Sequence, residues 1–113
     1  MNNHAQVAVI TDSGTNENVR IDFLHMKKAS MILRALNHKL RQQIIKLLDE
    51  HQKMTVTEIY VKLRLEQSVA SQHLAILRRA GIVGTRREGK FIYYAINYNR
   101  VRDISHFVEE FLK

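Results

Sequence analysis

The residues best suited to chemistry in this chain lie on one face of the segment from Gln67 to Ala80. If the segment is helical, a turn of about 100° per residue brings the hydroxyls and amide of Ser68, Ser71 and Gln72 together. Short polar side chains of this kind can reach base edges in the major groove of DNA, and an alanine can meet a thymine methyl. We therefore predict base contacts from one set of side chains: Gln67, Ser68, Ser71, Gln72 and Ala75.

A solvated helix face is the alternative explanation of that pattern, and the neighbouring sequence argues against it. Thr55 or Thr57 can cap a short helix that ends before residues 64–66, so a helix, a turn and a longer helix follow one another. In the next segment, basic residues lie on both sides of Gly89, where DNA phosphates would lie. The alternative is that these charges prevent an exposed strand edge from pairing with another chain. Predicted DNA backbone contacts are Arg78, Arg79, Arg86, Arg87 and Lys90.

His73 lies on the same helix but on the opposite arc from Ser68, among Val69, Leu74 and Leu77. We therefore expect it to pack against the domain or to form a buried hydrogen bond. A phosphate contact from the border of the helix is the alternative.

The rest of the chain predicts the elements that must hold this helix. We expect a flexible tail over residues 1–17, a first helix over 18–36, a second helix capped by Asn37 and ending near His51, and a last helix over 99–113. Between the helix of residues 67–80 and the last helix, residues 82–87 and 90–96 are predicted to form a hairpin. The fold class is mostly α with a β-hairpin wing, in the order α-α-α-α-β-β-α, with one winged helix-turn-helix domain over residues 18–113.

Composition narrows the possible partners. The 113 residues carry 18 Lys and Arg against 11 Asp and Glu, a formal net charge of +7, which favours an anionic partner such as nucleic acid. The chain has no cysteine, so disulfides and thiolate metal sites are excluded. We expect a cytoplasmic protein, because no segment predicts a membrane span or signal peptide, and no enzyme, because no catalytic motif is present.

Three stretches together resemble the ArsR-type winged-helix repressors: ALNHKLRQQIIKLLDE, SVASQHLAILRRAGIV and TRREGKFIYYAI. The resemblance covers nearly all of residues 32–97. It implies a homodimer joined by the first and last helices, which binds an imperfect palindrome in promoter double-stranded DNA and leaves it when an inducer arrives. A basic protein-docking module without sequence-specific DNA reading is the alternative, although it would not need Ser68, Ser71 and Gln72.

The last helix carries an apolar stripe that a small domain has little left to cover, which also predicts a dimer. The predicted interface residues are Leu24, Ile32, Val101, Ile104, Val108 and Phe111.

The sequence does not identify the inducer. Residues 58–63 lack the cysteines with which many members of that family sense metals. Asp103, His106 and Glu110 share a helix face but form a weak set for zinc, with a solvated polar face as the alternative, so we expect no metal or other cofactor.

Overall fold

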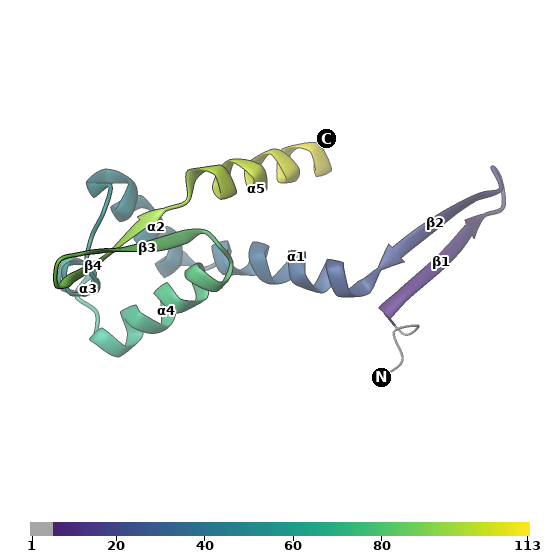
Figure 1. Ribbon diagram of the computed structural model, residues 1–113. Coiled ribbons are helices and arrows are strands. Elements are labelled where there is room, and N and C mark those ends of the chain that lie inside the picture. Colours follow the sequence, from purple (N-terminus) through teal and green to yellow (C-terminus); the bar gives the residue numbers. More distant parts are fainter. Residues whose placement is uncertain (1–5) are drawn as a thin grey trace. The chain divides into compact units, whose positions relative to one another are not determined.

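The computed structural model describes residues 6–113, which form two compact units that meet in the sequence between Ile32 and Leu33 (Figure 1). The helix α1 (Phe23–Leu36) contains this boundary. Each unit is described by itself below.

The first unit contains a β-hairpin where we expected a flexible tail up to residue 17 and a helix from Asn18. Strands β1 (Val7–Asp12) and β2 (Glu17–Asp22) pair antiparallel. The Asp12 carboxylate accepts a hydrogen bond from the Gly14 amide at 2.9 Å, which closes the turn. The β-branched residues of β1, with Val19 and Ile21 alternating in β2, are a hairpin signal, whereas we had taken the turn residues as a sign of a flexible tail. Residues 1–5 of the expected tail lie outside the described residues.

The second unit confirms the predicted order of helices and hairpin after the end of α1 (Figure 1). Its elements are α2 (Lys39–His51), α3 (Val56–Leu63), α4 (Gln67–Arg79), β3 (Val83–Glu88), β4 (Phe91–Ile96) and α5 (Tyr98–Phe111). No helix within residues 6–113 is both long enough and apolar enough to cross a membrane.

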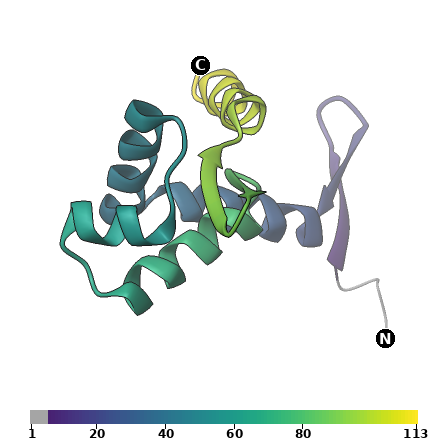
Figure 2. The same ribbon diagram turned by 60° about the vertical axis from the view of Figure 1, so that its left-hand side comes forward.

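The core of this unit joins α2, α3, α4 and the start of the wing. Its largest fully buried side chains are Ile44, Leu48, Ile59, Leu74, Leu77 and Ile82. Figure 2 shows α3 and α4 following one another at an angle, as a helix-turn-helix requires. Because α4 supplies two of these six side chains, its inner face is fixed by the same core that holds α2 and α3.

The wing is attached to this core through the backbone. Met54 and Tyr94 exchange two backbone hydrogen bonds, at 3.1 and 2.7 Å, so the segment between α2 and α3 runs beside β4. At the other edge, Gly81 adopts a φ of 76° after α4, and the Ile82 amide donates to the Leu77 carbonyl at 3.0 Å. Gly81 thus ends α4 as its position in the sequence predicts.

The cap of α2 is His38 and not Asn37. The Asn37 amide still donates to the Leu33 and Arg34 carbonyls and therefore closes α1. His38 Nδ1 instead accepts a hydrogen bond from the Leu40 amide at 3.2 Å. Our prediction followed the general preference for asparagine at N-caps, but the two helices are so close in sequence that Asn37 belongs to the end of the first.

Truncation of Leu77 tests the dependence of α4 on this core. Leu77→Ala should lower the free energy of unfolding by about 2–5 kcal/mol, because it removes buried methyl groups and leaves a cavity. Val61→Ala is the matched control, since Val61 is 64% exposed on α3, and should change that free energy by less than about 0.5 kcal/mol. Urea unfolding followed by circular dichroism measures both, and equal losses would show that α4 does not rely on this contact.

Candidate nucleic-acid interface

The helix-turn-helix is built from α3, a three-residue turn and α4. Thr55 begins α3 with a capping box, in which its hydroxyl accepts from the Glu58 amide while the Glu58 carboxylate accepts from the Thr55 amide. These hydrogen bonds from the Thr55 amide and hydroxyl lower the pKa of Glu58. Arg64 then takes a left-handed conformation with a φ of 56°, and the Leu65 amide donates to the Tyr60 carbonyl at 2.9 Å, which turns the chain into α4.

The two faces of α4 have opposite environments. Ala70, Leu74 and Leu77 are buried against the core, whereas the hydroxyl and amide side chains are exposed. Every residue predicted to contact bases lies on the exposed side: Gln67, Ser68, Ser71, Gln72 and Ala75. The helix therefore leaves a continuous face of short side chains open while its other face is held.

The cations predicted to contact the DNA backbone do not all lie together. Arg78 and Arg79 are exposed in the last turn of α4. In the wing, consecutive residues of a strand point to opposite faces, so Arg86 and Arg87 separate. The Arg87 guanidinium turns toward the tip and donates to the Gly89 carbonyl at 3.1 Å, and Lys90 lies beside it in the turn.

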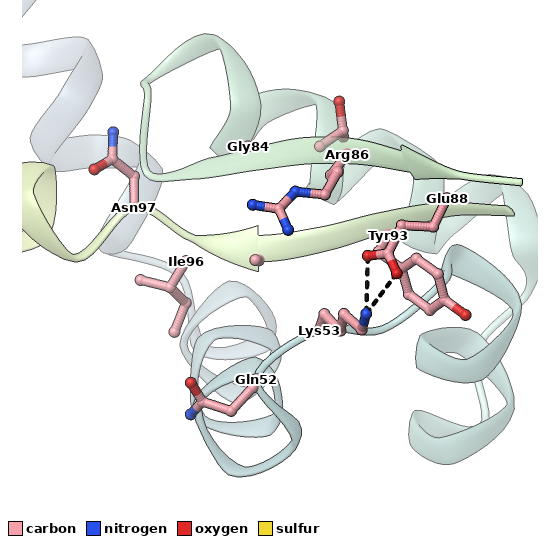
Figure 3. Close-up of a pocket in the computed structure, with 10 residues that line it drawn as sticks. Gln52, Lys53, Gly84, Arg86, Glu88, Tyr93, Ile96 and Asn97 are labelled. Atoms are coloured by element: carbon pink, nitrogen blue, oxygen red, sulfur yellow. Dashed lines mark hydrogen bonds and ion pairs between the residues drawn. The ribbon is translucent and has the colours of Figure 1, made fainter.

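Arg86 lies instead on the face of the wing that holds a shallow hollow of about 430 Å³ (Figure 3). Lys53 crosses this hollow and binds both carboxylate oxygens of Glu88, at 2.7 and 2.8 Å, while its ammonium lies 4.8 Å from the centre of the Tyr93 ring. Figure 3 shows the Arg86 guanidinium over the same face. The wing tip therefore presents Arg87 and Lys90, while Arg86 belongs to a different surface.

The predicted dimer residues fall in both units. Leu24 is exposed and Ile32 half-buried on α1, while Val101, Ile104 and Val108 are half-buried on α5 and Phe111 is exposed. Phe107, which is not among the predicted interface residues, is 51% exposed and stacks on Phe111 with ring centres 5.8 Å apart. An apolar strip thus runs along α5 to its end, and Phe107 belongs to it.

The residues considered for a metal do not form a site. Asp103, His106 and Glu110 are exposed on α5, and Glu110 instead pairs with Lys113 at 2.8 Å. Within residues 6–113 there is no group of three or more His, Asp or Glu side chains placed to hold a metal ion.

One important side chain of this region, Arg41, was missed in the sequence. His73 is half-buried as expected, but its hydrogen-bond partner is Arg41, which is only 8% exposed. Arg41, Ile44 and Leu48 lie three and seven positions apart, so all three share one face of α2. A charge inside that apolar stripe was the signal available in the sequence.

Residues 38–85 match the model of the arsR family of bacterial regulatory proteins. An uncharacterized HTH-type transcriptional regulator of Methanocaldococcus jannaschii is 40% identical over 84 residues, which cover 74% of this chain and 94% of that protein. The transcriptional activator HlyU of Vibrio cholerae is 39% identical over 75 residues, or 66% of this chain and 68% of that protein.

One relative is similar in both sequence and structure. The transcriptional repressor PagR of Bacillus anthracis is 33% identical over 85 residues, covering 75% of this chain and 85% of that protein. Its crystal structure matches with a TM-score of 0.62 over 77% of this chain and 99% of that one, at 31% identity. The matched regions include the helix-turn-helix described above.

Proposed function

Because this chain belongs to the ArsR family of bacterial transcriptional regulators and is not an enzyme, we propose that it binds promoter DNA as a homodimer and reads it with α4. The observation that carries this proposal is the exposed face of α4, from Gln67 to Ala75, opposite a face on which Ala70, Leu74 and Leu77 are buried. A helix held in this way can enter the major groove with its short polar side chains toward the base edges. We expect it to act in the cytoplasm.

Phosphate contacts complete the interface. The exposed Arg78 and Arg79 extend from the end of α4, and Arg87 and Lys90 extend from the wing tip. Contacts of this kind fix the register of a protein on DNA, while base contacts give the sequence preference. Arg86 is left out of this set, because it lies over the hollow on the other face of the wing.

The dimer would place two copies of α4 on two half-sites about one helical turn, roughly 34 Å, apart on a DNA palindrome. The support for it is the apolar strip of α5, with Val101, Ile104 and Val108 half-buried and Phe107 and Phe111 exposed. Together with Leu24 and Ile32 of α1, these side chains are the interface we propose. We further propose that the protein acts as a repressor that a chemical signal releases.

A selected duplex gives the direct test. The 113-residue protein selects its preferred sites from a random duplex library, and fluorescence anisotropy then compares the selected duplex with a scrambled one at two salt concentrations. A preference for the selected duplex that survives higher salt supports specific recognition. If both duplexes bind equally and salt abolishes both, the protein is a charged docking module.

Gln72→Ala should reduce discrimination between selected and scrambled duplex by about 1–3 kcal/mol for each lost base contact. Gln43→Ala is the matched control, because Gln43 is an exposed glutamine of α2 outside the proposed interface. Anisotropy titrations of both variants provide the measurement. Equal weakening on both duplexes would remove Gln72 from the base-reading set.

Arg87→Ala should weaken binding to every duplex and make the slope of log affinity against log salt shallower by about one unit. Arg102→Ala removes the same charge from α5, where Arg102 hydrogen-bonds Asn99, and should leave the slope nearly unchanged. The measurement is a salt series on the scrambled duplex. An unaltered slope for Arg87→Ala would contradict a phosphate contact.

Ile104→Asp should convert the dimer to a monomer, because it places a charge in the proposed apolar interface. Ser105→Asp introduces the same charge at an adjacent, exposed position and should preserve the dimer. Sedimentation velocity gives the oligomeric state of each. A wild-type monomer, or a dimer that tolerates Ile104→Asp, would argue against this interface.

A further inference from the structure

Arg41 is the one buried charged residue within residues 6–113, and backbone carbonyls surround its guanidinium. Its Nε donates to the Ala35 carbonyl at 2.7 Å and its Nη2 to the Arg34 carbonyl at 3.3 Å. Both carbonyls belong to the last turn of α1, which carries partial negative charge, and the Arg34 carbonyl also accepts from the Asn37 amide at 3.1 Å. The end of α1 therefore balances the positive charge of Arg41.

The third nitrogen of the guanidinium, Nη1, contacts a residue of α4. Arg41 Nη1 lies 3.2 Å from His73 Nδ1. A guanidinium has only donors and stays charged, so His73 Nδ1 must accept this hydrogen bond. His73 is consequently neutral in this arrangement, with its proton on Nε2.

A second imidazole lies against the first. The rings of His38 and His73 are 4.8 Å apart between centres, and His38 Nδ1 is already the acceptor that caps α2. The end of α1, the start of α2 and the middle of α4 thus meet at three basic side chains. Within residues 6–113, no carboxylate forms an ion pair with any of the three.

We propose that Arg41 and His73 position α4 for base reading, and that protonation of His73 breaks this link so that acid weakens specific DNA binding. This inference rests on the proposed function, because it concerns the same helix. His73 is a positioning residue here: its side chain faces α2, on the arc opposite the base-reading face.

The geometry explains why acid should act at this point. Protonation of Nδ1 would turn an N–H toward Arg41 Nη1–H, so the hydrogen bond would be lost and two positive charges would face each other at 3.2 Å. Burial, followed by the positive charges of His38 and Arg41, lowers the pKa of His73 below the usual 6.5. His38, which precedes α2, and Arg41 of α2 are the titratable groups that act on it.

The sign of the effect follows from proton binding. A histidine whose pKa is lowered in the folded state binds more protons when the link is broken. The link is therefore fully present above about pH 6.5 and is lost as the pH falls from there through the lowered pKa of His73. General electrostatics predicts the opposite, because a protein gains positive charge in acid and should then bind any duplex more tightly.

The test is the ratio of affinities for the selected and scrambled duplexes at about pH 7.5 and about pH 5.5, at constant ionic strength. For the wild type, the ratio should fall severalfold at the lower pH, with about tenfold as the upper limit that the titration of one histidine of ordinary pKa 6.5 allows. His73→Asn retains an acceptor near the position of Nδ1 but does not titrate, so its ratio should change by less than about threefold. His51→Gln, at the exposed end of α2, is the matched control and should behave like the wild type.

The outcomes separate the two proposals. A wild type that does not prefer the selected duplex even at about pH 7.5 refutes the proposed function itself. A wild type whose ratio is the same at both pH values refutes only the present inference, as does His73→Asn with the same acid-induced loss as the wild type.

If His73→Asn does not fold, NMR titration of the wild-type His73 ring decides the question. The expected result is a midpoint below 6.5, with the amide signals of α4 shifting at the same midpoint. A midpoint at or above 6.5, or α4 signals that do not follow it, overturns the proposal.

Discussion

The second unit depends on one constraint: the core must fix α4 by packing against only one face of the helix, so that the opposite face stays exposed. Leu74 and Leu77 are fully buried, while Ser71 and Gln72 beside them are exposed. A helix buried on all sides could not enter a DNA groove. A loosely held helix would have to be ordered on binding, and the cost of that ordering would reduce the free-energy difference between correct and incorrect bases. The core therefore supplies the rigidity on which the proposed base contacts rely.

Arg41 extends this support beyond the hydrophobic core. An apolar side chain at its position could fill the space, but it would leave the Ala35 and Arg34 carbonyls at the end of α1 without this donor. The guanidinium donates to both carbonyls through Nε and Nη2, and its Nη1 still donates to His73. One buried charge thus connects the end of α1 to α4, the proposed recognition helix, through a hydrogen bond that we propose to depend on the protonation of His73.

The wing divides its cations between two surfaces because adjacent residues of a strand face opposite ways. Arg87 and the turn residue Lys90 lie at the tip, whereas Arg86 lies over the hollow that Lys53 and Glu88 cross. The number of basic residues in the wing sequence is therefore larger than the number at the wing tip that could contact a DNA backbone.

The sequence alone determined the elements of the second unit and the two faces of α4. Helical periodicity placed Leu74 and Leu77 inside and Ser71 and Gln72 outside, because that pattern is a local property of the chain. The glycine at position 81 likewise marked the end of α4. For residues 7–22 the local signals were present but were misread, since β-branched residues flank the turn.

Only the tertiary structure decided which distant residues meet. Arg41 and His73 are 32 positions apart, and Lys53 and Glu88 are 35 apart, so no local pattern relates either pair. The periodicity of α4 predicted a packed His73 but not its partner. That partner depends on how α2 crosses α4, and the crossing is set by the packing of the whole core.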